Sequence, residues 1–295
     1  MFRGLSAFPL TPMYQDKVDE PRFVNLIKRL VVAQVDSITV LGSTGAYAYL
    51  DRDERVEVVR TAVEHAQGVP VFAGVGALRT SHVLRNAQDA EEAGAKALLL
   101  APVSYQPLTE GDVIGLFEAV AGATDLPIII YDNPGTTRFR FTYDLYARLA
   151  RIPNVVAIKI PGALESGDQA RNRLAEIRSS VGAEISIGIS GDASAAEMLS
   201  AGCDTWYSVI GGTFPNAAQS LLRAAQIGGS GQAPSSETLL PVWDLFQKHG
   251  SFRAIAALAE ESGLAQRSSL PLPIQGLNDE ERVAVREVLE QLHLS

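Results

Sequence analysis

Cysteine, histidine and lysine are scarce in this chain of 295 residues. It contains one cysteine, Cys203, and four histidines, His65, His82, His249 and His293. A single cysteine excludes an intrachain disulfide and a cluster of thiolate ligands, and it is typical of a protein from a reducing compartment. The histidines lie far apart and form no HxxxH or similar ligand pair, so we expect no bound metal.

The chain also lacks an excess of basic charge and any long apolar run. Lys and Arg number 25 against 34 Asp and Glu, a formal net charge of −9. A surface that binds nucleic acid or an anionic membrane needs clustered basic charge. No stretch approaches the ~18 apolar residues of a membrane span, and the first residues do not resemble a signal peptide. We therefore expect a cytoplasmic protein with neither nucleic acid nor membrane as partner.

Short apolar runs alternate with amphipathic segments along most of the chain. Most runs show no polar alternation, as expected for strands covered on both faces of a parallel sheet. The eight runs begin at or near Arg3, Ser37, Pro70, Ala97, Pro127, Val155, Glu184 and Thr205. Helix-like segments between them include 19–34, 52–67, 81–93 and 111–123. Eight strand–helix units predict an α/β fold of the (β/α)8 type, a TIM barrel.

An open doubly wound sheet is the alternative fold. The eighth strand disfavours it, and so does the absence of a complete dinucleotide-binding fingerprint. The candidate segment, Gly74–Arg79, has Arg79 where a third glycine is required, which is typical of a tight turn between a strand and a helix.

The pattern changes after residue 227. A Gly/Ser/Pro-rich stretch at 228–234 predicts a linker, and no strand pattern returns beyond it. Three helical segments are expected at 236–248, 251–264 and 279–294. We therefore divide the chain into a barrel domain, 1–227, and a linker with a C-terminal three-helix appendage, 228–295.

One of only five lysines ends an apolar strand. The run Val155–Ile158 leads directly into Lys159, and reactive groups of such barrels lie at the C-terminal ends of strands. Burial disfavours the charged form of an amine, lowers its pKa and makes the neutral nucleophile available. The alternative is a lysine whose stem is buried and whose ammonium reaches water.

Two neighbouring positions at the same rim carry hydroxyl groups. Tyr131 ends the preceding strand at the position that corresponds to Lys159, where its phenol could transfer the protons needed to form and dehydrate a carbinolamine. The alternative for this residue is a core tyrosine. The turn Gly42–Gly45 contains Ser43 and Thr44, which can bind a carboxylate without placing a positive charge beside the lysine.

These segments occur together, in an order that resembles one enzyme superfamily. The matching segments are Ala7–Pro12, Gly42–Gly45, Tyr131–Pro134, Lys159 and Ser190–Asp192. They resemble, in turn, the opening strand, the carboxylate-binding loop, the catalytic tyrosine motif, the Schiff-base lysine and a strand-seven loop. The superfamily is that of dihydrodipicolinate synthase and N-acetylneuraminate lyase, the class I aldolases and lyases, and the resemblance covers nearly the whole chain.

The resemblance implies a lyase that acts on pyruvate or another 2-oxo acid. Lys159 would form an imine, which serves as an electron sink for cleavage or formation of a carbon–carbon bond or for loss of water. Tyr131 would relay protons together with Ser43, and Ser43 and Thr44 would hold the carboxylate. The Gly191 carbonyl would orient the imine. No metal or organic cofactor is implied, and members are commonly homo-oligomers, either dimers or homotetramers.

Several positions depart from the pattern of dihydrodipicolinate synthases. Thr136 stands where an arginine binds the second substrate, with Arg138 two places on. Ala46 replaces a glutamate. Ser104 holds the place of a tyrosine that enters the neighbouring subunit's proton relay, and Tyr105 is offset from it by one residue.

Tyr207 occupies a strand position that is usually small or aliphatic, and we expect it to narrow the pocket. The candidate substrate-binding residues are Ser43, Thr44, Tyr105, Thr136, Gly191 and Tyr207. Two alternatives to a lyase of unspecified 2-oxo acid stay open: 4-hydroxy-tetrahydrodipicolinate synthase itself, and an inactive barrel that binds a 2-oxo acid or regulates. The losses at Ala46 and Ser104 favour the inactive barrel, whereas Lys159 and Tyr131 oppose it.

Overall fold

Eight parallel strands close into a barrel in the computed structural model, which describes residues 1–163, 167–227 and 236–294. The strands are β1 (Gly4–Ala7), β4 (Ser37–Val40), β5 (Val71–Gly74), β6 (Ala97–Leu100), β7 (Ile128–Tyr131), β8 (Val155–Ile160), β9 (Ser186–Ser190) and β10 (Thr205–Ser208). The barrel is closed because β1 pairs with both β4 and β10. Each predicted apolar run contains one strand, and the predicted TIM barrel is confirmed.

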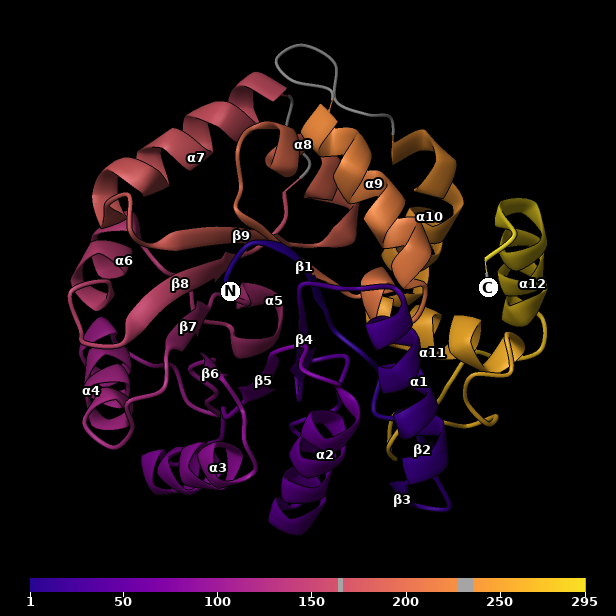
Figure 1. The fold of residues 1–295 in the computed structure, drawn as a ribbon, viewed down its shortest axis with the longest axis horizontal. Helices are drawn as coiled ribbons and strands as arrows, with labels where there is room; N and C mark the ends of the chain where they lie inside the picture. The colour runs from indigo at the N-terminus through magenta and orange to yellow at the C-terminus, as the bar shows by residue number, and fades with distance from the viewer. Residues whose placement is uncertain (164–166, 228–235, 295) are drawn as a thin grey trace.

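Helices surround the strands on the outside (Figure 1). They are α1 (Glu20–Val32), α2 (Arg52–His65), α3 (Thr80–Glu92), α4 (Glu110–Ala121), α6 (Tyr143–Leu149), α7 (Gly167–Val181), α8 (Ala195–Ser200) and α9 (Pro215–Ile227). Local sequence sets where they begin: Asp51 and Glu54 form a capping box at α2, and Thr109 and Asp112 form another at α4. These boxes direct the chain out of the loops that follow β4 and β6.

Three further helices, α10 (Leu240–His249), α11 (Ser251–Glu261) and α12 (Glu281–Leu292), lie at one side of the barrel (Figure 1). The predicted C-terminal appendage is therefore present, and a short 3-10 turn, η3 (Ser236–Leu239), precedes α10. Buried Arg282 fastens α12 to α11 through Glu260 and Glu261. The predicted linker at 228–234 lies outside the described residues, and the division of the chain at residue 227 stays a prediction.

Several short elements interrupt the regular alternation without having been predicted. They are the hairpin β2 (Met13–Tyr14) and β3 (Lys17–Val18), the short helix α5 (Pro134–Thr137) and the 3-10 turns η1 (Asp192–Ser194) and η2 (Ile210–Gly212). Three of them, α5, η1 and η2, directly follow β7, β9 and β10, at the rim where the candidate site residues were expected. No helix among the described residues has the length and apolar character needed to cross a membrane.

The interior of the barrel is packed with apolar and aromatic side chains, including Phe8, Phe72, Leu99, Ile129 and Tyr207. Room for the Tyr207 ring comes from the neighbouring strand, where a glycine stands. A Cβ added to Gly188 would lie 2.4 Å from Cε2 of Tyr207 and 2.9 Å from the backbone oxygen of Thr205. The aromatic ring therefore requires a residue without a side chain at position 188.

We expect Gly188→Ala to lower the free energy of unfolding by about 1–3 kcal/mol, because overpacking forces the ring or the strand to move. The matched control is Gly115→Ala in α4, where an added Cβ meets no atom within 4 Å. In that helix interior, alanine should raise the free energy of unfolding by about 0.5–1 kcal/mol. Urea denaturation measures both, and wild-type stability of Gly188→Ala would contradict this packing.

Candidate active site

Lys159 and Tyr131 lie side by side at the C-terminal ends of adjacent strands. The register of β7 and β8 pairs them directly. The Lys159 side chain is buried, with Nζ 3.8 Å from the ring centroid of Tyr131 and 4.9 Å from that of Phe8. The amine thus faces two aromatic rings, and no carboxylate of the described residues forms an ion pair with it.

Burial lowers the pKa of Lys159 below its usual value of 10.5. Tyr131 opposes this shift by charge and hydrogen bonding, and the negative charges of Asp192 and Asp132 oppose it more weakly. Desolvation is the largest of these effects, because the low-dielectric surroundings disfavour the ammonium form. A lowered pKa increases the fraction of neutral amine near pH 7, and neutral amine is the nucleophilic form.

The phenol of Tyr131 belongs to a cluster of three polar side chains. Its Oη lies 3.1 Å from Oγ of Ser43, in the loop after β4. Asn133 donates from Nδ2 to both oxygens, at 2.8 Å to Tyr131 and 3.2 Å to Ser43. Tyr131 and Ser43 were predicted as site residues, whereas Asn133 was not. Its one signal in the sequence was its place two residues after Tyr131, in the same motif.

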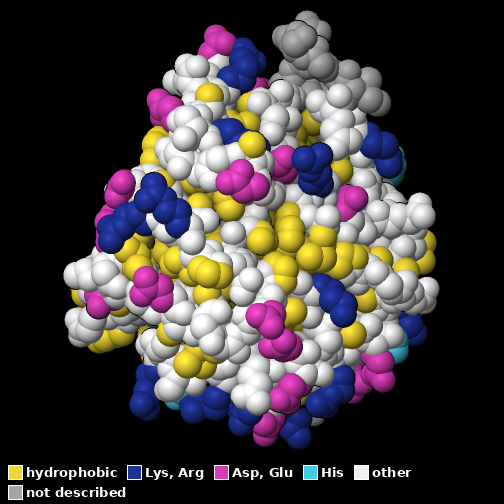
Figure 2. Space-filling view, turned by 60° about the vertical axis from the view of Figure 1, so that its left-hand side comes forward, with side chains coloured by type: hydrophobic (Ala, Val, Ile, Leu, Met, Phe, Trp, Pro, Cys, Tyr) yellow, Lys and Arg dark blue, Asp and Glu magenta, His cyan; other side chains and the backbone are white. Residues whose placement is uncertain are grey.

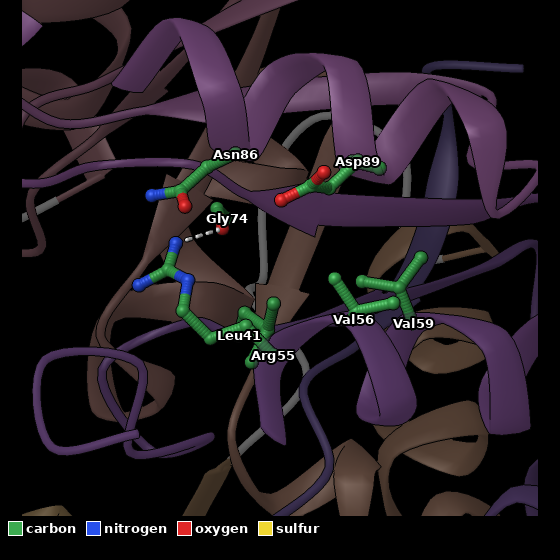
Figure 3. A pocket seen from close by; sticks show the side chains of 8 residues that line it. Leu41, Arg55, Val56, Val59, Gly74, Asn86 and Asp89 are labelled. Atoms are coloured by element: carbon green, nitrogen blue, oxygen red, sulfur yellow. Dashed lines mark hydrogen bonds between the residues drawn. The ribbon is translucent and has the colours of Figure 1, made fainter. Parts of the chain in front are cut away.

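A buried arginine supports the Ser43 loop from behind. Arg55, in α2, donates to the Tyr47 carbonyl at 2.7 Å and to the Gly74 carbonyl at 2.9 Å, which ties the loop after β4 to the end of β5. Figure 3 shows its guanidinium directed at Gly74, with Asn86 and Asp89 on the helix opposite. Burial lowers the pKa of Arg55 to about 10.

A cavity of about 10 Å³ lies beside this arginine, between α2 and α3. That volume is about the size of one water molecule, so the region is nearly filled. Thr44, in the supported loop, is itself buried. The body of the barrel therefore holds the loop that carries Ser43 and Thr44, in addition to the hydrogen bonds that Ser43 forms with Tyr131 and Asn133.

Asp132 anchors the chain at the end of β7 to β8 and to α6. Its backbone N–H donates to the Lys159 carbonyl at 3.1 Å, and its carboxylate accepts a 2.5 Å hydrogen bond from the hydroxyl of Tyr146 in α6. Burial raises the pKa of Asp132 from 3.8 to about 6, although the Tyr146 hydrogen bond and nearby Arg173 oppose the rise. This carboxyl was not predicted as part of the site.

The loop after β9 is fixed to the loop after β10 by a second buried carboxyl. Asp192 accepts hydrogen bonds from Nε1 of Trp206 at 2.9 Å and from the backbone N–H of Ile210 at 2.7 Å. Burial raises its pKa to about 6. Gly191, the predicted imine-orienting residue, precedes it with φ of 90°, a backbone conformation that glycine adopts readily.

The remaining predicted residues lie at different depths. Tyr207 is 1% exposed inside the barrel, where its ring meets Phe8 edge-on at 5.9 Å and its hydroxyl has no hydrogen-bond partner among the described residues. Thr136 is exposed in α5, with Oγ1 3.4 Å from the Asn133 carbonyl. Tyr105 is 89% exposed, and no contact with the lysine or the three-residue cluster was found.

A buried lysine on β8, a tyrosine beside it on β7 and a Gly-Ser-Thr-Gly turn after β4 lie on one barrel rim. Comparison with known proteins identifies the family. The model of the dihydrodipicolinate synthetase family matches residues 1–292. The chain belongs to this family. A family relative from Methylococcus capsulatus, named 4-hydroxy-tetrahydrodipicolinate synthase, is 34% identical over 99% of both chains.

Solved structures of the family share the fold along the whole chain. A dihydrodipicolinate synthase from Agrobacterium tumefaciens is 47% identical with a TM-score of 0.94, covering 99% of this chain and 98% of that one. One from Acinetobacter baumannii, determined in complex with pyruvate, is 25% identical with a TM-score of 0.89 and full coverage of both chains. The predicted superfamily and the lyase class are confirmed.

We expect Tyr146→Phe to destabilise the protein more at pH 7.5 than at pH 5. The raised pKa of Asp132 means that the folded state holds its proton up to about pH 6, whereas the unfolded state loses it near 3.8. Stability therefore falls as the pH rises through this window. Above pH 6 the buried Asp132 carboxylate is ionised and depends on the hydrogen bond from the Tyr146 hydroxyl. Removal of this hydroxyl should therefore lower the free energy of unfolding by about 1.5–3 kcal/mol at pH 7.5.

Urea denaturation at both pH values measures this difference. Tyr143→Phe is the matched control, because Tyr143 stacks on Tyr146 at 6.4 Å but its hydroxyl forms no hydrogen bond with a described residue. An equal loss for Tyr146→Phe at pH 5 and pH 7.5 would contradict an ionised, hydrogen-bonded Asp132.

Proposed function

We propose that this chain is a class I lyase of the dihydrodipicolinate synthetase family that activates pyruvate or a related 2-oxo acid as an imine of Lys159. The observation that carries the proposal is the buried amine of Lys159, 3.8 Å from the Tyr131 ring, with the Tyr131 and Ser43 hydroxyls 3.1 Å apart beside it. An amine of lowered pKa supplies the nucleophile, and the paired hydroxyls supply protons.

Imine formation needs two proton deliveries to the same substrate oxygen. Nζ attacks the ketone carbon, a C–N bond forms, and the ketone oxygen takes a proton while the nitrogen loses one, which gives a carbinolamine. A second proton on the hydroxyl lets the C–O bond break, so water leaves and a protonated C=N bond remains. We assign both deliveries to Tyr131. Between them, the proton that the nitrogen loses returns to the Tyr131 oxygen, so that the phenol can donate again. The protonated imine then accepts the electron pair of a neighbouring carbon.

The substrate carboxylate is assigned to the Gly42–Gly45 turn. Ser43 and Thr44 offer hydroxyls and backbone N–H groups, which can bind an anion without adding a cation beside Lys159. A fixed positive charge in this turn would favour the neutral amine of Lys159 further. It would also hold the substrate carboxylate away from that amine. We assign the Gly191 carbonyl to the imine side of the pocket, and Tyr207 to filling the barrel near Phe8.

Sodium borohydride with pyruvate should add an irreversible mass to Lys159, found by peptide mass spectrometry. Lys159→Met should abolish the adduct. Tyr131→Phe should keep the fold but slow adduct formation by about 10²–10⁴-fold, because general acid catalysis contributes that much. A folded wild-type protein that gives no adduct with any of a panel of 2-oxo acids would contradict the proposal, and binding without an adduct would favour the inactive-barrel alternative.

The second candidate is 4-hydroxy-tetrahydrodipicolinate synthase, which the name of the Methylococcus relative favours. Thr136 argues against it, since this exposed threonine offers no guanidinium where those enzymes carry an arginine. We expect weak or no turnover of aspartate semialdehyde with pyruvate in a coupled assay. Turnover at the rate of a parallel synthase preparation would establish this second candidate instead.

We also propose that the protein is cytoplasmic and forms a homo-oligomer, a dimer or a tetramer. Apolar side chains form a band across one face of the molecule, shown in Figure 2. Separately, two large apolar residues project from neighbouring rim loops: Leu78 after β5 is 66% exposed, and Tyr105 after β6 is 89% exposed. Such exposed apolar groups support association, because soluble monomers rarely expose large apolar patches.

A further inference from the structure

The amide of Asn133 occupies the corner between two hydroxyl groups. Nδ2 donates to Oη of Tyr131 at 2.8 Å and to Oγ of Ser43 at 3.2 Å, and these two oxygens are themselves 3.1 Å apart. The three groups form a closed ring in which each side is a hydrogen bond. All three residues belong to one chain, and they come from β7, the turn after it and the loop after β4.

The side chain of Asn133 does not cap the helix that follows it. It is the N-cap of α5, where an asparagine side chain usually accepts a hydrogen bond from the first turn of the helix. Here the side chain makes no such bond, while its backbone carbonyl accepts from the N–H groups of Thr136 and Thr137, both at 3.0 Å. Pro134 restricts the backbone of the residue before it. The backbone is thus fixed by the turn, and the side chain is directed at the two hydroxyls instead.

Counting hydrogens shows what the amide does in the ring. Its nitrogen carries two hydrogens and lies within hydrogen-bond distance of both hydroxyl oxygens, and it offers no acceptor there. Each hydroxyl has a single hydrogen, so the contact between Tyr131 and Ser43 uses one and leaves the other free to point outward. The ring has two arrangements, with either the tyrosine or the serine hydrogen outward. Asn133 satisfies one lone pair on each oxygen in both.

We propose that Asn133 is a positioning residue for imine chemistry, whose amide holds the Tyr131 and Ser43 hydroxyls so that they present one proton at a time to the substrate oxygen. The inference rests on the proposed function, since it assigns the ring to the two proton deliveries of imine formation. When Tyr131 gives up its proton, the charge that develops on Oη is already met by an N–H donor.

Single-turnover imine formation with pyruvate, quenched by borohydride, tests the role of the amide. Asn133→Leu keeps the size and removes both donors, and we expect it to slow adduct formation by about tenfold or more. The half-saturating pyruvate concentration should change by less than about threefold, since the reaction rather than binding is affected. Asn133→Asp should be at least as slow as Asn133→Leu, because a carboxylate only accepts hydrogen bonds.

The control is Asn86→Leu in α3. It removes a different amide donor, which forms a 3.2 Å hydrogen bond with the Val75 carbonyl. It should form the adduct at the wild-type rate.

A double variant tests whether Asn133 acts through Tyr131. In a Tyr131→Phe background, Asn133→Leu should change the rate of adduct formation by less than about threefold, because the effect of Asn133 passes through Tyr131. An equal loss in both backgrounds, or a wild-type rate for Asn133→Leu or Asn133→Asp, would overturn the inference. A wild-type rate for Asn133→Asp would show that the ring needs no donor at this corner.

A second measurement does not depend on activity. Tyrosine labelled with ¹³C at Cζ reports the hydrogen bonding of its hydroxyl, and Tyr131→Phe identifies the Tyr131 signal. This signal should move in Asn133→Leu and Asn133→Asp but stay in place in Asn86→Leu. An unmoved signal overturns the role of Asn133, whether or not the protein forms the borohydride adduct. A moved signal in a protein whose wild type forms no adduct would overturn the proposed function and leave the hydrogen-bonded ring intact.

Discussion

The burial of one amine against two aromatic rings is the constraint on which the site depends. Lys159 lies within the barrel with its Nζ over Tyr131 and Phe8, and desolvation lowers its pKa because its surroundings cannot solvate an ammonium group. An ion pair with a carboxylate would stabilise the charged form and remove the nucleophile. Asp192 and Asp132 oppose the shift only weakly, and the groups hydrogen-bonded to Tyr131 are a hydroxyl and an amide, which carry no charge.

Buried polar groups behind the site keep it in place. Arg55 ties the Ser43 loop to the end of β5, Asp132 links the backbone of Lys159 to Tyr146, and Asp192 joins the loops after β9 and β10. Each of these three groups is buried, and each forms hydrogen bonds with loop backbone or with a neighbouring side chain. The rim is therefore preorganised by polar contacts beneath it, which is how a site gains precise geometry from loops.

Much of this could be predicted from the sequence because the barrel strands are buried on both faces and appear as apolar runs. A lysine or tyrosine that ends such a run is unusual. Because residues at corresponding positions of adjacent parallel strands are neighbours, Lys159 and Tyr131 were predicted to lie together. Asn133 was missed because an asparagine before Pro134 is typical of a turn, and only the fold shows that its amide meets Ser43. The exposure of Tyr105 also depends on the fold, since no local pattern determines it.

The titration of the Lys159 amine tests the central claim most directly. With only five lysines in the chain, ¹³C labelling at lysine Cε gives few signals, and Lys159→Met identifies the one that matters. If burial determines the chemistry, this signal titrates well below the ordinary lysine pKa of 10.5. Titration of the Lys159 signal at or above that value would show a solvated or ion-paired ammonium, and it would contradict the account.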